Sequence, residues 1–367
     1  MIATLGGNAD HAGSYRRLRR SNALTDRPPP PLARPSGFAL PMPSRLGEAD
    51  LIARYFAPLA GPAGLGLRDD AALMRPPPGE DLVLTTDALV AGVHFFADDP
   101  PGTIARKALR VNLSDLAAKG ARPLGFLLAL ALPSDWSDEW LAAFVDGLGA
   151  DVIDFKCPLL GGDTVATPGP LTLSVTVIGA VAQGRMPRRT GVRPGDRLYV
   201  TGTIGDSALG LKVRQGRGPD ISQADKAFLL ERYLTPQPRL KLIGAMAAHA
   251  SGGMDVSDGF VGDLTKMLDV SGVTARVQIY RLPLSRAARA AIAADPDLFE
   301  VAATGGDDYE LLASSSRESA AAFEAAAAAV GVPLTFVGEA VEGRRPPIFI
   351  GPDGNPVVFE RASYSHF

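Results

Sequence analysis

The sequence predicts a mixed α/β protein (α/β or α+β) made of two successive halves. Segments with strand patterns alternate with segments of helical period along the chain after residue 46. Residues 184–196, with four arginines, two prolines and three glycines, interrupt this alternation and mark the predicted boundary between the halves. A length of 367 residues and a hydrophobic content of 46% suffice for two packed cores.

Each element of the first half is predicted from its apolar spacing and its end signals. In the first helix, Leu51, Tyr55 and Phe56 recur at helical spacing. Pro101 and Gly120 bound a second helix, because proline favours the first turn and glycine the position after the last. In order, the elements are a helix at 48–59, a strand at 82–84 that ends in Thr85-Thr86-Asp87, a helix at 104–119, a strand at 126–132, a helix at 136–152 and a strand at 171–181.

The second half resumes the alternation after the predicted boundary. Ser257-Asp258-Gly259 opens one of its helices, and Gly305-Gly306 lies just before one of its strands. In order, the elements are a strand at 198–200, helices at 206–213, 224–233, 239–250 and 263–270, a strand at 309–313 and an Ala-rich helix at 318–330.

Residues 1–46 differ from the rest of the chain in composition. Seven arginines face only two aspartates there, and Pro28 to Pro31 form a polyproline run. A segment of this kind cannot bury enough apolar surface to fold. We therefore expect a disordered extension at 1–46, followed by domains at 47–184 and 185–367.

Charge, cysteine content and hydropathy exclude several classes of function. A net charge of −3 provides no general attraction for nucleic acid. The single cysteine, Cys157, excludes an intramolecular disulfide and a Cys-rich zinc site, and it fits the reducing cytoplasm. The best apolar run, residues 126–132, is too short to cross a bilayer, so no membrane partner is expected.

Five short acidic blocks are the most informative feature of the sequence. Carboxylates gathered at one site repel one another, so a cation is expected among them. Mg²⁺ takes oxygen ligands and commonly shares them between carboxylates and substrate phosphates, which points to phosphoryl transfer. The chain has no P-loop and no protein-kinase motif set, so another architecture must bind the nucleotide. The blocks are Asp69-Asp70, Thr85-Thr86-Asp87, Asn112-Leu113-Ser114-Asp115, Gly161-Gly162-Asp163 and Asp255-Val256-Ser257-Asp258-Gly259.

These blocks and their order resemble the thiamine-monophosphate kinases, members of the aminoimidazole ribonucleotide synthetase superfamily. The resemblance implies a two-domain fold with mixed sheets covered by helices, and an N-terminal ATP- and Mg²⁺-binding domain that pairs in a homodimer. It also implies ATP-dependent phosphorylation of thiamine monophosphate to thiamine diphosphate, by direct transfer with several Mg²⁺ ions. The matching blocks lie at 66–72, 85–95, 111–120, 160–164, 200–208, 255–259 and 305–311, and the ending Tyr364-Ser365-His366-Phe367 matches as well.

The resemblance also implies the residues of the site. Gly162, Arg189 and Ser257 match ATP contacts, while His94, Asp307 and Tyr364 match contacts to the thiamine substrate. No general base is expected, because a phosphate oxygen is already a competent nucleophile. The expected metal ligands are Asp70, Thr85, Thr86, Asp87, Asp115, Asp163, Asp255 and Asp258.

Two positions depart from the family pattern. Arg68 stands where the family usually has glycine, so the loop around it loses backbone freedom or gains a direct phosphate contact. Asp307 stands where the family commonly has glutamate, so its carboxylate is one methylene further from the substrate.

Specific residues distinguish the predicted function from other functions of the same fold. A selenophosphate synthetase would have a reactive cysteine or selenocysteine near its Gly-rich N-terminal loop, and a hydrogenase maturation factor a C-terminal cysteine. Cys157, the single cysteine here, is at neither position. Another ATP-using member, such as an aminoimidazole ribonucleotide synthetase, stays open, although His94 and the C-terminal ending favour the thiamine enzyme. A non-catalytic nucleotide-binding descendant also stays open, and Arg68 is the one residue that favours it.

Overall fold

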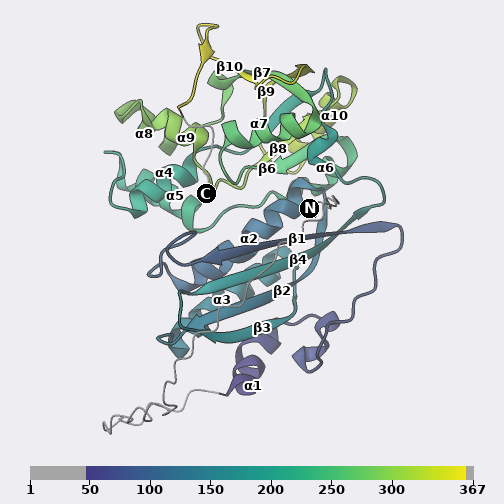
Figure 1. Cartoon of the computed structure of the whole chain (residues 1–367), viewed down its shortest axis with the longest axis vertical. Helices are drawn as coiled ribbons and strands as arrows, with labels where there is room; N and C mark the ends of the chain where they lie inside the picture. The colour runs from purple at the N-terminus through teal and green to yellow at the C-terminus, as the bar shows by residue number, and fades with distance from the viewer. Residues whose placement is uncertain (1–46, 361–367) are drawn as a thin grey trace, which may run out of the picture. The chain divides into compact units, whose positions relative to one another are not determined.

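Two mixed sheets flanked by helices make up residues 47–360, the part of the chain that the computed structural model describes (Figure 1). This arrangement confirms the predicted mixed α/β class. The extension predicted at 1–46 and the C-terminal position Tyr364 lie outside the described residues. No helix between residues 47 and 360 has both the length and the apolar character needed to cross a membrane.

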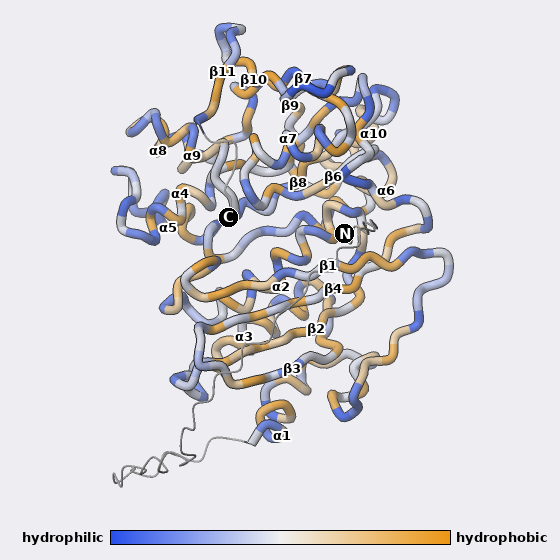
Figure 2. The backbone as a smooth tube through the Cα atoms, viewed as in Figure 1, coloured by the Kyte–Doolittle hydropathy of each residue, from blue (hydrophilic) through white to orange (hydrophobic). Residues whose placement is uncertain are grey.

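The first sheet has the strand order β1-β4-β2-β3. Strands β1 and β2 run antiparallel to β4, and β3 runs parallel to β2. Two long helices, α2 and α3, pack on one face, where alternate strand residues such as Val175 and Val177 are buried. Figure 2 shows these strands as predominantly hydrophobic. The bounds are β1 Glu80–Val90, β2 Arg122–Pro133, β3 Leu159–Thr167, β4 Thr172–Ala182, α2 Pro101–Ala118 and α3 Asp138–Phe155.

The second sheet has the strand order β11-β10-β7-β9-β5-β8-β6. Its neighbours are antiparallel except β7 and β10, which are parallel. The strands are β5 Arg197–Thr201, β6 Gly252–Asp255, β7 Val273–Gln278, β8 Leu311–Ser315, β9 Leu334–Glu342, β10 Ile348–Ile350 and β11 Pro356–Val357, and the helices are α4 Asp206–Arg214, α5 Gln223–Leu234, α6 Ile243–His249, α7 Phe260–Ser271, α8 Arg286–Ala294, α9 Leu298–Thr304 and α10 Arg317–Ala329.

Several predicted elements change at their ends. The helix predicted at 48–59 is helical throughout, as α1 Glu48–Leu51, a π segment Ile52–Phe56 and a 3-10 turn Ala57–Leu59. The strand predicted at 82–84 continues to Val90, so Thr85-Thr86-Asp87 lies within a strand and not at its end. Continued pairing with β4, including Asp87 opposite Val175, is the reason.

Helix α2 packs against both sheets. One face covers β1 and β4, and the C-terminal end packs against β6 and β8. Ala117 and Ala118 are fully buried there, in one apolar cluster with Tyr199 and Leu311 of the second sheet. A residue placed on α2 can therefore face groups from both halves of the chain.

Two glycines let the segments 255–259 and 304–310 pack backbone against backbone. A Cβ atom on Gly259, which has φ of +118°, would lie 2.3 Å from the carbonyl oxygen of Thr304. A Cβ atom on Gly306 would lie 2.2 Å from the carbonyl oxygen of Ser257. The contact is closed by a hydrogen bond of 2.8 Å from the N–H of Asp307 to the same oxygen of Ser257. Two acidic segments are thereby held side by side.

Substituting Gly306→Ala tests this backbone contact. The added methyl group must displace the Ser257 backbone, so we expect the free energy of unfolding to fall by about 3 kcal/mol. The control Gly244→Ala adds a methyl group to α6 with no atom within 4 Å, and it should be neutral or stabilising by about 0.5 kcal/mol. Urea denaturation of both variants measures the difference, and equal effects would contradict the contact.

Candidate active site

Asp87, Asp115 and Asp255 form one group, which we call the central carboxylates. They come from β1, α2 and the end of β6, and each acts electrostatically on at least one of the others. The hydroxyl of Thr85, on β1, donates a hydrogen bond to Asp115. Helix α2 brings the group together because it packs on β1 with one face and on β6 with its C-terminal end.

Burial and mutual repulsion raise the pKa of two central carboxylates. Burial, followed by the charge of Asp115, raises the pKa of Asp87 from 3.8 to about 6. Burial and then the charge of Asp115 raise the pKa of Asp255 well above its ordinary range, although a hydrogen bond from Ser114 opposes the rise. The local surroundings thus disfavour the charged form of both groups, as expected of a site that operates with a cation.

Thr85 and Thr86 of β1 lie on opposite faces of the first sheet, because successive side chains of a strand alternate between its faces. Thr85 and Asp87 point toward α2, whereas Thr86 points to the opposite face of the sheet. There the hydroxyl of Thr176, on β4, donates to the Thr86 hydroxyl at 2.9 Å. The Thr86 hydroxyl is therefore not brought to the central carboxylates.

Asp70, Asp163 and Gly162 line a second site, a cavity of about 270 Å³ beside β3. In the sheet order, β1 and β3 are the two edges, three strand spacings or about 14 Å apart. Asp163 is thus separated from Asp87. Glycine is required at 162, because a Cβ atom there would lie 1.8 Å from the carbonyl oxygen of Leu128.

Arg68 precedes the aspartates of this second site without straining the chain. It has φ of −113°, which any residue adopts. The positive φ angles of this loop lie earlier, at Leu65, Gly66 and Leu67. The substitution of Arg for the usual glycine therefore costs no backbone freedom in this conformation.

The donor atoms of both groups suit Mg²⁺ in their chemistry. Carboxylate and hydroxyl oxygens are the ligands that this ion prefers, and it commonly takes the rest of its shell from water and phosphate. Within residues 47–360, no three Asp, Glu, His or Cys side chains are arranged to hold a metal ion by themselves. These side chains would therefore supply only part of a coordination shell, which phosphate oxygens would complete.

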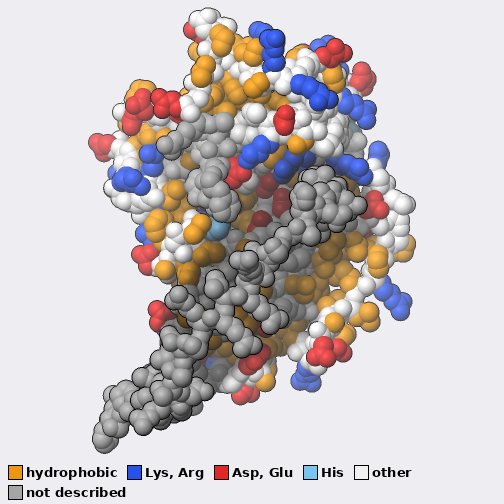
Figure 3. Space-filling model, viewed as in Figure 1, with side chains coloured by type: hydrophobic (Ala, Val, Ile, Leu, Met, Phe, Trp, Pro, Cys, Tyr) orange, Lys and Arg blue, Asp and Glu red, His pale blue; other side chains and the backbone are white. Residues whose placement is uncertain are grey.

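Cationic side chains border the central carboxylates. Lys119, at the end of α2, donates to the carbonyl oxygen of Gly253 at 2.7 Å. Burial, followed by the charge of Arg189, lowers the pKa of Lys119, while Asp255 and Asp115 oppose the change. Figure 3 shows acidic side chains in a hollow with Lys and Arg side chains along its rim.

Ser257 and Asp258 form the turn before α7. Their backbone N–H groups donate to the Asp263 carboxylate at 3.0 and 2.8 Å. Lys266 forms an ion pair of 2.6 Å with Asp258 and one of 3.1 Å with Asp263. Asp258 therefore has a counter-ion of its own in this structure.

His94 and Asp307, predicted substrate contacts from the two halves, meet at Lys107 of α2. The ammonium group of Lys107 donates to Asp307 Oδ2 at 2.8 Å and to the His94 carbonyl oxygen at 3.1 Å. The Nδ1 atom of His94 accepts from the N–H of Val90 at 3.0 Å, so a neutral imidazole there carries its proton on Nε2.

The segment that carries Asp307 is held in a strained conformation. Asp307 and Tyr309 have φ of +72° and +51°, a region costly for residues other than glycine. Asp308, buried between them, accepts hydrogen bonds from the N–H groups of Gly205 and Ser207 at 2.6 and 3.1 Å. Strain of this kind persists only where the surroundings hold the backbone firmly.

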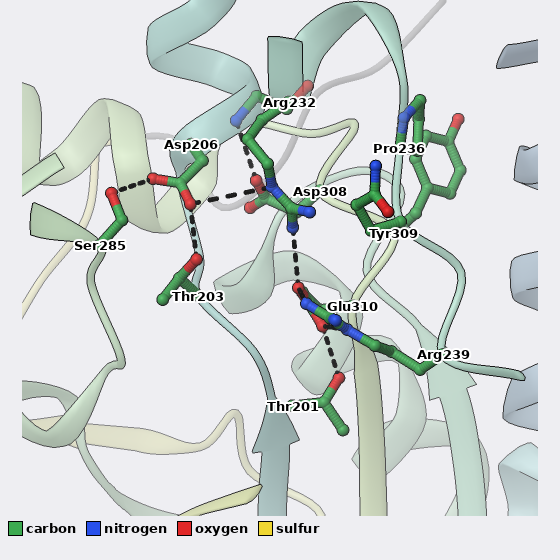
Figure 4. A network of polar contacts seen from close by, with 12 residues as sticks. Thr201, Thr203, Asp206, Arg232, Pro236, Arg239, Ser285, Asp308, Tyr309 and Glu310 are labelled. Atoms are coloured by element: carbon green, nitrogen blue, oxygen red, sulfur yellow. Dashed lines mark hydrogen bonds and ion pairs between the residues drawn. The ribbon is translucent and has the colours of Figure 1, made fainter. Parts of the chain in front are cut away.

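Glu310 anchors the end of this segment in a buried ionic network (Figure 4). Its carboxylate accepts from Arg232 at 2.8 Å, from Nε of Arg239 at 2.6 Å and from the hydroxyl of Thr201 at 2.7 Å. Removing one partner of such a buried group leaves an uncompensated charge, which is strongly destabilising. The network therefore fixes where Asp307 and Tyr309 lie.

The sequence interpretation did not assign a role to Lys107, Lys119 or Tyr309. Tyr309 shares the environment of the central carboxylates, because burial and then the charges of Asp307, Asp87 and Asp255 raise its pKa. A signal for Lys107 was available in the sequence. With Arg110 and Ser114 it forms a polar stripe at spacings of three and four residues, beside apolar residues such as Leu109 and Leu113.

This chain is similar to known proteins over both of its halves. Residues 68–181 match the model of the AIR synthase related protein N-terminal domain, and residues 193–351 match that of its C-terminal domain. A thiamine-monophosphate kinase of Caulobacter vibrioides is 47% identical over 301 residues, which cover 81% of this chain and 84% of that protein.

Two solved structures are similar over most of their length. The thiamine-monophosphate kinase of Stenotrophomonas maltophilia superposes with a TM-score of 0.72 at 39% identity, covering 79% of this chain and 91% of that one. AaThiL complexed with AMPPCP and TMP superposes with a TM-score of 0.70 at 29% identity, covering 87% and 94%.

The raised pKa of Asp87 leads to a stability prediction. The pKa of Asp87 is higher in the folded state than its ordinary value, so ionisation of Asp87 lowers the free energy of unfolding. This loss develops as the pH rises from about 4 through about 6. Two pKa units correspond to at most about 3 kcal/mol, and partial exposure reduces this to about 1 kcal/mol. In EDTA, Asp87→Asn should therefore raise the free energy of unfolding by about 1 kcal/mol at pH 8 and leave it unchanged at pH 4.

Urea denaturation at the two pH values measures this gain, with Asp220→Asn as the control. Asp220 is an exposed aspartate between α4 and α5, and its substitution should be neutral at both pH values. A gain for Asp87→Asn that is the same at pH 4 and pH 8 would show that ionisation of Asp87 does not destabilise the fold, contrary to its raised pKa.

Proposed function

The chain belongs to the thiamine-monophosphate kinase family, and we propose that it phosphorylates thiamine monophosphate with ATP by direct, Mg²⁺-assisted transfer. The product is thiamine diphosphate, so the protein is a phosphotransferase with a phosphate group as acceptor. The observation that carries the proposal is the group of central carboxylates between the two sheets. The kinship to named thiamine-monophosphate kinases favours this function over an aminoimidazole ribonucleotide synthetase or a non-catalytic descendant.

The chemistry required of the protein is positioning and charge compensation. The substrate phosphate is its own nucleophile, so no side chain needs to remove a proton. Mg²⁺, when bound, would neutralise charge on the phosphates and on the central carboxylates. We assign that role to Asp87, Asp115, Asp255 and the Thr85 hydroxyl, which lie close together where α2 meets β1 and β6. Asp70, Asp163 and Asp258 are proposed ligands that lie outside this group, and Thr86 can contribute its backbone carbonyl oxygen alone.

ATP is proposed to lie between the second site and the central carboxylates. Gly162 offers close approach of the backbone to phosphate beside β3, where the cavity of about 270 Å³ lies. Lys119 interacts electrostatically with Asp115 and Asp255, and Arg189 lies near enough to Lys119 to act on it, so both are proposed phosphate contacts. Ser257, in the turn before α7, is the proposed contact on the second half.

Thiamine is proposed to bind at His94 and Asp307, with Tyr364 completing the contact. An anionic carboxylate and an imidazole suit a cationic heteroaromatic ligand. AaThiL, which is solved with TMP, supports this choice of substrate. Lys107 joins the two described residues, as shown by its hydrogen bonds.

A homodimer is proposed through the uncovered face of the first sheet. Apolar side chains on three of its strands are exposed, among them Leu84 at 63%, Leu127 at 37% and Val165 at 48%. A contiguous exposed apolar face marks an interaction surface, and a second copy of the chain is the commonest partner. The proposed compartment is the cytoplasm, in keeping with a free, buried Cys157 whose pKa burial raises to about 12.

A coupled assay with two variants tests the proposed activity. The purified protein with ATP, Mg²⁺ and thiamine monophosphate should form thiamine diphosphate, and EDTA should stop the reaction. Asp87→Asn and Asp115→Asn should each lower kcat at least about a hundredfold, whereas Asp220→Asn should keep it. Normal turnover of Asp87→Asn at saturating Mg²⁺ would remove the central carboxylates from the mechanism.

Sedimentation of one surface variant tests the proposed dimer. Leu84→Glu places a charge on the uncovered face, midway along its edge strand β1, and should shift the protein from dimer to monomer at micromolar concentration. The control Val358→Glu changes an apolar residue that is 89% exposed and lies outside this sheet, so its mass should match the wild type. A dimeric Leu84→Glu variant would place the interface elsewhere.

A further inference from the structure

Lys107 is a buried cation with three partners from separate segments. Its side chain is 3% exposed, and its ammonium group contacts Asp307 and the carbonyl oxygen of His94 at 2.8 and 3.1 Å. The same group lies 4.1 Å from the centre of the Tyr233 ring, at the end of α5. One ammonium group thus donates hydrogen bonds to a loop of the first half and to the 305–310 segment of the second. It also lies over an aromatic ring of α5.

The loop that carries His94 is tied to the second half at further points. Arg214 of α4 forms ion pairs with Asp98 and Asp99, at 2.5 and 2.6 Å. The ring of Phe96 meets that of Tyr233 edge to face, with centroids 6.4 Å apart. The 91–100 loop is therefore held against α4 and α5, and Lys107 lies where this loop meets the strained 305–310 segment.

The burial of Lys107 is not explained by stability alone. Burying an ammonium group costs free energy that an ion pair only partly returns, and an apolar side chain of similar size is often as stable. Met would fill the same space beside Tyr233. The positive charge of Lys107 is therefore not needed for packing and indicates a functional role. Its two hydrogen bonds are made to His94 and Asp307, the proposed thiamine contacts.

We infer that Lys107 is a positioning residue that sets the spacing of His94 and Asp307 and thereby the affinity for the thiamine substrate. This inference rests on the proposed function of those two residues. Without the ammonium group, the Asp307 carboxylate has no counter-ion at that position and its strained backbone loses one of its restraints. His94 loses the hydrogen bond at its carbonyl oxygen. Substrate binding should weaken while the phosphoryl-transfer end, at the central carboxylates, is unaffected.

The test compares Lys107→Met with Arg106→Met. Arg106 is the preceding residue of the same helix and is 32% exposed. It pairs with Asp151 at 3.1 Å, an aspartate that keeps Arg110 as its main partner. Lys107→Met should raise KM for thiamine monophosphate about tenfold, with kcat and KM for ATP within about twofold. Arg106→Met should keep all three constants within about twofold. Calorimetric titration with thiamine monophosphate should give the same change in Kd.

Two more variants separate this inference from the proposed function. Asp307→Asn alone should raise KM for thiamine monophosphate, and the double variant Lys107→Met/Asp307→Asn should raise it no further than the larger single effect. The double variant leaves no unpaired charge, so it keeps the test valid if Lys107→Met alone unfolds. The inference is wrong if Asp307→Asn raises KM but Lys107→Met leaves KM unchanged. It is also wrong if the effects of the two substitutions add in the double variant. If Asp307→Asn leaves KM unchanged, the proposed thiamine site itself is wrong.

Discussion

The repulsion among the central carboxylates is the constraint on which the site depends. Asp87, Asp115 and Asp255 are held together although burial and mutual charge raise the pKa of two of them. A fold that only needed stability would separate these groups or pair each with a cation, as Lys266 pairs with Asp258. Bringing them together is consistent with a ligand that carries its own cations. The proposed nucleotide with Mg²⁺ is such a ligand, and its phosphates would also suit the Lys and Arg side chains at the rim.

Helix α2 is the element through which this constraint is met. Its apolar residues, such as the fully buried Leu109 and Leu113, each contribute about 1.5–3 kcal/mol by burial in the first core. Polar residues of α2 and of its C-cap donate hydrogen bonds to the second half of the chain. Lys107 donates to Asp307, and Arg110, Ser114 and Lys119 donate to the carbonyl oxygens of Pro236, Tyr309 and Gly253, respectively. The same helix therefore supports the proposed thiamine contacts, the strained segment and the central carboxylates. A shift of α2 would disturb all three together.

The sequence predicts α2 well because Pro101, Gly120 and a run of apolar residues act locally. It misses β3, since Gly161-Gly162-Asp163 has the composition of a turn and becomes a strand only by pairing with β2. The residues of the site are predicted by family motif, whereas their grouping is not. Asp87 and Asp163 look equivalent in sequence, yet the strand order places them on opposite edges. The position of Thr86 could have been predicted from the two-residue period, had the strand been known to continue. Asp255 joins Asp115 through long-range packing that no local pattern encodes.

The central claim is that the central carboxylates bind divalent cations together with the nucleotide. Electron paramagnetic resonance of Mn²⁺ titrated into the protein, with a non-hydrolysable ATP analogue present, measures this most directly. The account predicts tightly bound Mn²⁺ in the wild type and fewer bound ions in Asp87→Asn and in Asp255→Asn, while Asp220→Asn binds as the wild type does. Equal numbers of bound Mn²⁺ in all four proteins would contradict it.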